Sequence, residues 1–61
     1  MPNDVDLVRV TDAARRLGIS RTKLYTLMRA GEIRFVKIGR CRRVRVRELM
    51  RFIERHVHGT P

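Results

Sequence analysis

The junction Leu17-Gly18-Ile19-Ser20 constrains the fold of this chain more than any other part of its sequence. Gly18 is placed to end one helix, because glycine readily takes the left-handed conformation that follows a helix C-terminus. Ser20 is placed to begin another, because its hydroxyl oxygen can accept a hydrogen bond from the free amides of a first turn. Ile19 between them can anchor the turn in an apolar core. Two helices joined so tightly predict a helix-turn-helix unit.

The segments on both sides of this junction have helical periodicity. Apolar residues share one face in each segment: Ala13, Ala14 and Leu17 in the first, and Leu24, Leu27 and Met28 in the second. We expect the first helix over residues 12–17, with Thr11 as its N-cap. We expect the second over residues 21–30, closed by Gly31. Each helix would bury its apolar face against the rest of the chain.

After the second helix the periodicity changes from helical to alternating. Val44 and Val46 alternate with arginines, which is typical of a strand. We expect a two-stranded ribbon with a turn at residues 39–42. Its core-facing side chains would be Val36, Ile38, Val44 and Val46, and its outward-facing ones Lys37, Arg43 and Arg45. The direction of Phe35 stays open.

The end of the chain is helical again. Leu49, Phe52 and Ile53 recur at helical spacing and predict a third apolar stripe. We expect the N-cap of this helix near Arg47, although arginine is a poor capping residue. Before the first helix, residues 7–10 fit either a short strand or an extended lead-in.

These elements fit one small domain. The predicted fold class is α+β, mostly helical: a small winged helix-turn-helix with a two-stranded wing and a C-terminal helix. The domain would span residues 1–61, with a core at about residues 8–57. A chain of this length buries only about 60% of its unfolded surface and has little room for a substrate cleft.

The sequence contains no motif for catalysis or for cofactor binding. It lacks a nucleotide-binding glycine loop and a candidate catalytic triad. Cys41, His56 and His58 are too few and wrongly spaced for a structural zinc site. We interpret Cys41 as a small loop residue and the histidines as solvated or helix-end residues. We therefore expect no enzyme, no cofactor and no metal.

Nothing in the sequence predicts a membrane partner. No run approaches the roughly 18 apolar residues that a membrane span needs. Polar residues such as Asn3 and Asp4 interrupt the opening stretch, so we expect no secretory leader after Met1. The expected compartment is the cytoplasm.

The charge of the chain is strongly and unevenly basic. Lys and Arg number 15 against 6 Asp and Glu, for a formal net charge of +9. Between Arg15 and Arg47 the only acidic residue is Glu32, although soluble surfaces usually mix both signs. Such a surface attracts polyanions. Few aromatic residues are present to stack single-stranded bases, so we expect double-stranded DNA rather than RNA.

The candidate DNA-contacting residues form two groups. The second helix, about 15 Å long, fits a major groove. It would contact bases or phosphates through Ser20, Arg21, Thr22 and Lys23, and the DNA backbone through Tyr25 and Arg29. The ribbon would contact phosphates or the minor groove through Lys37, Arg40, Arg42 and Arg43. For Tyr25, packing at the edge of the core is an equal alternative.

The order of these motifs resembles the excisionase-type helix-turn-helix domain, a family related to the DNA-binding domain of MerR-like regulators. The resembling motifs are Thr11-Asp12-Ala13-Ala14, Leu17-Gly18-Ile19-Ser20-Arg21, Leu24-Tyr25, Gly31-Glu32-Ile33, Lys37-Ile38-Gly39-Arg40, Val44-Arg45-Val46 and Glu48-Leu49. They cover about residues 8–55. The resemblance implies that the helix after Ser20 enters the major groove and that residues 39–43 form the wing.

The resemblance also implies a function. Proteins of the excisionase branch are recombination directionality factors, which bind side by side near an attachment site, bend DNA and help an integrase to excise a mobile element such as a phage. The implied partners are double-stranded DNA, an integrase and further copies of a protein that is a monomer in solution. MerR-like regulators carry a dimerising helix and an effector domain after this module. The chain ends at Pro61 without them, which favours the excisionase branch. A small transcriptional regulator is the alternative.

Overall fold

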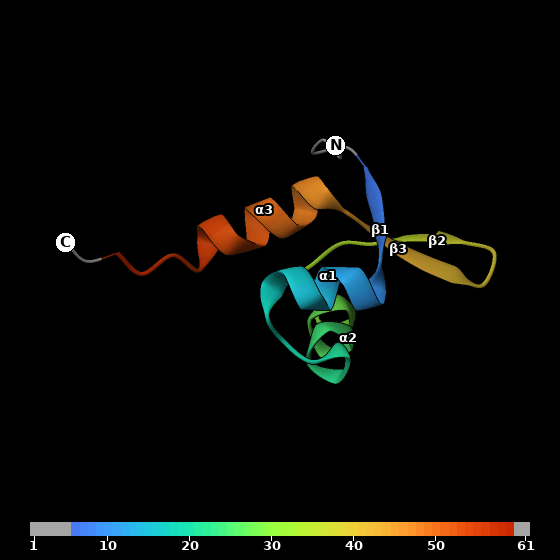
Figure 1. Cartoon of the computed structure of the whole chain (residues 1–61), viewed down its shortest axis with the longest axis horizontal. Helices are drawn as coiled ribbons and strands as arrows, with labels where there is room; N and C mark the ends of the chain where they lie inside the picture. The colour runs from blue at the N-terminus through green and yellow to red at the C-terminus, as the bar shows by residue number, and fades with distance from the viewer. Residues whose placement is uncertain (1–5, 60–61) are drawn as a thin grey trace.

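The computed structural model describes residues 6–59 (Figure 1). Residues 1–5, where we expected no leader, and residues 60–61 at the end of the chain lie outside the described residues. The elements in chain order are β1 Leu7–Arg9, α1 Val10–Leu17, α2 Arg21–Arg29, β2 Val36–Ile38, β3 Cys41–Arg45 and α3 Val46–Arg55. The predicted α+β class is confirmed, with two helices joined by a tight turn, a strand hairpin and a last helix.

The turn between α1 and α2 forms as predicted. Gly18 has a φ of 70° and a ψ of 30°, the left-handed conformation that suits glycine, and its amide donates to carbonyls of the last turn of α1. The Ser20 hydroxyl oxygen accepts a hydrogen bond of 3.0 Å from the amide of Lys23. Each helix end therefore has a local cap, and only three residues, Gly18, Ile19 and Ser20, connect α1 to α2.

The sheet contains one strand more than predicted. β3 is central, and β1 and β2 pair with its two edges, both antiparallel. Residues 7–9 are therefore a strand rather than an extended lead-in. Because this strand passes directly into α1, the helix begins at Val10 with Arg9 as its N-cap, and the predicted N-cap at Thr11 is wrong. The predicted ribbon is the β2–β3 hairpin, whose tip extends beyond β1.

The hairpin turn is shorter than predicted. It consists of Gly39 and Arg40, and Gly39 takes a φ of 62° that its lack of a side chain allows. Cys41 and Arg42 belong to β3, so Cys41 lies in a strand and not in a loop. The register pairs Val36 with Arg43, Lys37 with Arg42, and Ile38 with Cys41.

This register changes which hairpin side chains face the core. Paired residues share one face of a sheet and neighbours in a strand alternate, so Val36 and Ile38 lie opposite to Val44. Val44 is buried, whereas Ile38 is 56% exposed, and the prediction that Ile38 packs in the core is wrong. Lys37 is exposed as predicted, but it shares the face of Val44 and not that of Arg43.

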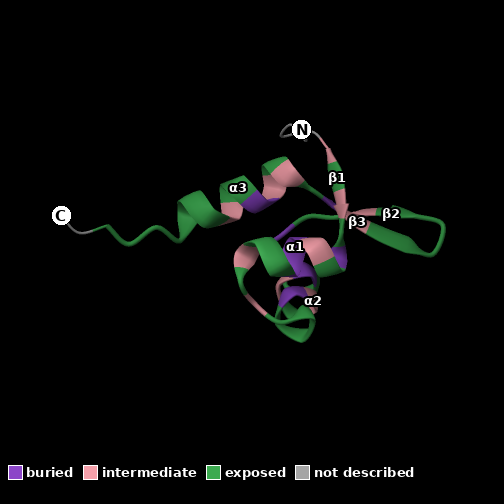
Figure 2. Ribbon diagram, viewed as in Figure 1, coloured by how far each residue is buried: buried purple, intermediate pink, exposed green. Residues whose placement is uncertain are grey.

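The core lies between α1, α2, the sheet and the first half of α3 (Figure 2). Its buried members are Val10, Ala13, Ala14, Leu24, Met28, Ile33, Val44 and Leu49. Leu24, Ile33 and Val44 are the largest fully buried side chains. No polar or charged residue among residues 6–59 is buried, so apolar burial is the main contribution that packing makes to stability.

α3 begins earlier and is less buried than predicted. It begins at Val46 with Arg45 as its N-cap, not near Arg47, and Arg45 makes no side-chain cap hydrogen bond. Leu49 is buried, but Ile53 is exposed, so the prediction of Ile53 as a core residue is wrong. The later half of α3 extends away from the body (Figure 1). Neither α3 nor another helix within residues 6–59 has the length and apolar character needed to cross a membrane.

Candidate nucleic-acid interface

α2 and the β2–β3 hairpin both carry basic side chains and no acidic ones. α2 buries Leu24 and Met28 and leaves the side chains of its first turn exposed. The hairpin is exposed at its tip and buried only near its base (Figure 2). Neither element contains an aspartate or a glutamate. The two elements together therefore offer a positive surface to a polyanion.

An arginine-lined concavity of about 300 Å³ lies where β1, the start of α1, α2 and the hairpin meet. Its lining residues are Arg9, Val10, Thr11, Arg21, Tyr25, Arg40, Cys41, Arg42 and Arg43. We call it the arginine concavity. None of its lining residues is acidic, so no carboxylate of the lining would compete with a nucleic-acid phosphate for its guanidinium groups.

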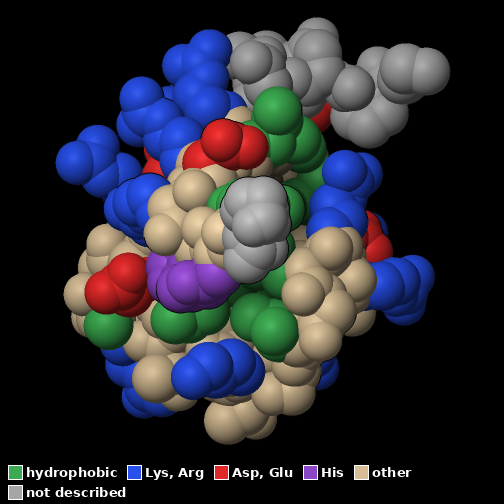
Figure 3. Space-filling model, turned by 90° about the vertical axis from the view of Figure 1, so that its left-hand side faces the viewer, with side chains coloured by type: hydrophobic (Ala, Val, Ile, Leu, Met, Phe, Trp, Pro, Cys, Tyr) green, Lys and Arg blue, Asp and Glu red, His purple; other side chains and the backbone are tan. Residues whose placement is uncertain are grey.

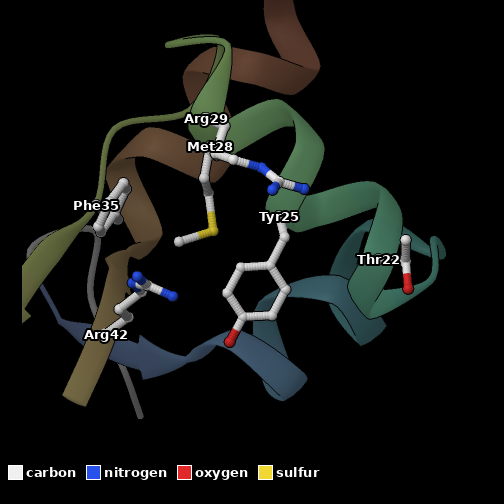
Figure 4. Close-up of a pocket in the computed structure, with 6 residues that line it drawn as sticks. All are labelled: Thr22, Tyr25, Met28, Arg29, Phe35 and Arg42. Carbon is white, nitrogen blue, oxygen red and sulfur yellow. The ribbon is translucent and has the colours of Figure 1, made fainter. Parts of the chain in front are cut away.

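A second concavity, of about 350 Å³, lies between α2 and the hairpin (Figure 4). It is lined by Thr22, Tyr25, Met28, Arg29, Phe35 and Arg42, and we call it the aromatic concavity. Tyr25 and Arg42 line both concavities and so separate them. The Arg42 guanidinium carbon lies 5.7 Å from the centre of the Tyr25 ring and 5.8 Å from that of Phe35, which are cation–π distances.

The structure brings most of the predicted contact residues together in these concavities. They are Arg21, Thr22, Tyr25, Arg29, Arg40, Arg42 and Arg43. The others, Ser20, Lys23 and Lys37, line neither concavity. The Ser20 hydroxyl oxygen caps α2 by accepting a hydrogen bond from the backbone amide of Lys23. Lys37 is exposed in β2 directly opposite Arg42.

Tyr25 packs at the edge of the core and also lines both concavities. Its side chain is half-buried and packs against the core. The guanidinium carbon of Arg42 lies 5.7 Å from the centre of its ring. The Tyr25 hydroxyl points away from Arg29 in Figure 4. The core thus fixes one side of the residue while the other side remains in the candidate interface.

Sequence reasoning missed Arg9 and Phe35. Arg9 belongs to β1 and is the direct cross-strand partner of Arg43. Two like charges at such a position repel each other, and a bound anion would relieve that repulsion. Arg9 would have been found only by pairing β1 with β3. The place of Phe35 beside Arg42 could not be inferred from the sequence, because it depends on how the segment before β2 packs against α2 and the hairpin.

The α3 end of the molecule has a different chemical character. Acidic side chains and exposed apolar ones lie among the basic residues there (Figure 3). Arg55 is exposed and donates a hydrogen bond to the backbone carbonyl of Glu32. A ring nitrogen of His56, at the predicted helix end, lies 2.9 Å from the Phe52 carbonyl oxygen. Within the described part of the chain, no group of three or more His, Cys, Asp and Glu residues could hold a metal ion.

Residues 7–57 match the family model described as "Helix-turn-helix domain". The chain belongs to this helix-turn-helix family. Over 44 residues, 72% of the chain, it is 52% identical to a protein of Saccharopolyspora erythraea named "Probable excisionase". The aligned part is 44% of that protein, so the chain spans less than half of this relative's length. No solved structure matches the chain significantly.

These similarities confirm the predicted resemblance to an excisionase-type helix-turn-helix domain. The family consists of non-enzymatic DNA-binding domains, and this agrees with the prediction that the chain is not an enzyme. Binding to DNA is therefore the general function of the domain.

Proposed function

We propose that this chain acts as an excisionase: it binds double-stranded DNA sequence-specifically near an attachment site, bends the DNA and assists an integrase in excising a mobile element. The observation that carries the proposal is the acid-free surface of α2 and the hairpin, on a chain 52% identical to a probable excisionase over 44 residues. A small binding domain suits an accessory role, in which the integrase performs the strand exchange.

In this proposal α2 enters the major groove. Arg21 is suited to pair with a guanine edge, and Thr22 and Lys23 to reach neighbouring bases or a phosphate. Ser20 and the free amides at the helix start are suited to a phosphate. The contacts to the DNA backbone or minor groove come from Tyr25, Arg29, Lys37, Arg40, Arg42 and Arg43.

Several copies would act together on one DNA site. A single domain of 61 residues has a limited interface, so neighbouring copies, each a monomer in solution, would increase affinity when they bind side by side. Bending a site costs of order 1–6 kcal/mol. Phosphate neutralisation by several copies would offset this cost, and binding would weaken steeply with salt. The protein would act in the cytoplasm, where its DNA target lies.

Selection of genomic fragments tests the proposal. The purified protein is mixed with fragments of its own genome at moderate salt, and the bound fragments are sequenced. We expect enrichment of one locus with closely spaced direct repeats beside an integrase gene. Absence of any enriched fragment would contradict specific recognition of duplex DNA.

Bending and excision are tested on the selected locus. Gel mobility of circularly permuted fragments should vary with the position of the site, because a bend near the middle slows a fragment most. Addition of the protein to the neighbouring integrase should stimulate excision of the element. Specific binding with unchanged mobility and unchanged excision would contradict the excisionase role.

A small transcriptional regulator is the second candidate. The matching family model describes the DNA-binding domain, and that domain alone also suits a promoter operator. The relation to MerR-like DNA-binding domains stays a prediction. Selected fragments that fall in promoters with no integrase gene nearby, together with changed transcription from those promoters, would support this candidate instead.

A further inference from the structure

Phe35 lies in the segment between α2 and β2, outside the core cluster. Its side chain is 38% exposed, and it is not among the apolar residues that pack against the buried core. An exposed aromatic residue is ordinary by itself. Phe35 differs because its ring lines the aromatic concavity and faces the guanidinium of Arg42.

The guanidinium of Arg42 lies close to two aromatic rings. The sheet register places it on the same face as Val44, which is the face toward α2. There its guanidinium carbon lies within 6 Å of two ring centres, those of Tyr25 on α2 and Phe35 before β2. Figure 4 shows the guanidinium below Phe35 and beside the Tyr25 ring, with the Met28 side chain between the two rings. Tyr25 is anchored by the core, so it offers a fixed support on one side, and Phe35 provides the other.

This arrangement matters because an exposed arginine is normally mobile. A free side chain loses conformational entropy when it is immobilised on a ligand, and prior restraint reduces this loss. A guanidinium on aromatic rings keeps its charge and the donors at its edge, so it can still bind a phosphate. Arg42 also separates the two concavities, with Arg29 in one and Arg21 in the other.

We propose that Phe35 is a positioning residue for DNA binding: with Tyr25, it holds Arg42 in the orientation that binds a phosphate of the DNA backbone. The proposal rests on the proposed DNA binding of α2 and the hairpin. It assigns the phosphate contact to Arg42, and Phe35 acts through Arg42 without contributing a charge of its own.

The test is a double-mutant cycle on DNA affinity. The dissociation constant for a duplex from the selected locus is measured across a range of salt concentrations for the wild type, Phe35→Leu, Arg42→Ala and the double variant. Phe35→Leu should weaken binding about three- to tenfold and leave the salt slope unchanged, because no charge is lost. Arg42→Ala should reduce the salt slope by about one. The double variant should bind no more weakly than Arg42→Ala alone.

Three controls separate positioning from folding. Phe35→Tyr keeps an aromatic ring, and this variant should bind DNA with the affinity of the wild type. Phe35→Met keeps apolar volume without a ring, and it should weaken binding as Phe35→Leu does, with thermal unfolding close to that of the wild type. Ile53→Ala removes exposed apolar surface on α3 and should leave DNA affinity unchanged.

Two results would overturn the proposal while DNA binding stands. Additive losses in the double variant would mean that Phe35 contacts DNA independently of Arg42. Wild-type affinity in both Phe35→Leu and Phe35→Met would mean that Arg42 needs no aromatic support. A wild-type protein that binds no duplex would instead refute the proposed function itself.

Discussion

α2 and α3 are both short basic helices with apolar residues at helical spacing, yet the structure uses them differently. In α2, Leu24 and Met28 are buried. In α3, Met50 and Ile53 are 53% and 45% exposed. Helical periodicity therefore identifies which residues share a face, but it does not reveal whether another element covers that face.

Charge separates the two helices in the same way. α2 has no acidic residue and faces the hairpin across the two concavities. α3 carries Glu48 and Glu54 among its arginines and extends at the opposite end from the hairpin tip (Figure 1). We infer that α2 is the helix that binds DNA and that α3 supports the core with its first turns. The following predictions test this contrast.

The largest contrast concerns stability. Leu24→Ala should lower the free energy of unfolding by about 2–5 kcal/mol, because it leaves a cavity in the core. Ile53→Ala should lower it by less than about 1 kcal/mol, because much of that side chain already contacts water. Urea denaturation followed by circular dichroism measures both values. Similar losses for the two variants would show that α3 is as firmly packed as α2.

The second contrast concerns DNA affinity. Arg21→Ala should weaken binding to the selected site by about 1–3 kcal/mol and relax the preference at one base pair, if Arg21 pairs with a guanine. Arg51→Ala, a matched exposed arginine on α3, should leave affinity and preference unchanged. Binding to a panel of single-base variants measures both. An equal loss on every duplex would remove Arg21 from base recognition.

The helix N-termini provide the third contrast. Ser20→Ala should destabilise the free protein by about 1 kcal/mol, because it removes the hydrogen bond to the amide of Lys23. Arg45→Ser should stabilise it by up to about 1 kcal/mol, because α3 has no side-chain cap. Thermal unfolding without DNA measures both changes. If Ser20→Ala is neutral, capping contributes nothing to the difference between the helices.

The smallest expected effect concerns Arg9. Arg9→Ala should lower the slope of log affinity against log salt concentration by about 0.9, because one phosphate contact is lost from the arginine concavity. Arg47→Ala on α3 should leave the slope unchanged. Titrations at several salt concentrations measure it. An unchanged slope for Arg9→Ala would exclude β1 from the DNA interface.

The parts of the fold that sequence predicted well depend on local rules. Gly18 and Ser20 act through backbone conformation and a hydrogen bond that spans three residues, so their roles can be inferred without knowing the rest of the structure. The basic character of α2 is likewise visible in the sequence, because the residues of one helix stay together.

The parts that sequence missed depend on pairing between distant segments. β1 joins β3 across more than thirty residues, and no local signal marks that partnership. The faces of the hairpin depend on a register that the two-residue turn determines, and so Ile38 was placed in the core incorrectly. For the same reason Arg9 and Phe35 could not be assigned to the interface before their neighbours were known.

The most direct test of the central claim is an amide chemical-shift titration of the isotope-labelled protein with a duplex from the selected locus. If α2 and the hairpin bind DNA, the largest shifts will fall at residues 20–29 and 37–43, with small shifts at residues 50–57. If the largest shifts fall at residues 50–57 and α2 stays unchanged, then α3 is the DNA-binding helix and the assignment of α2 is wrong.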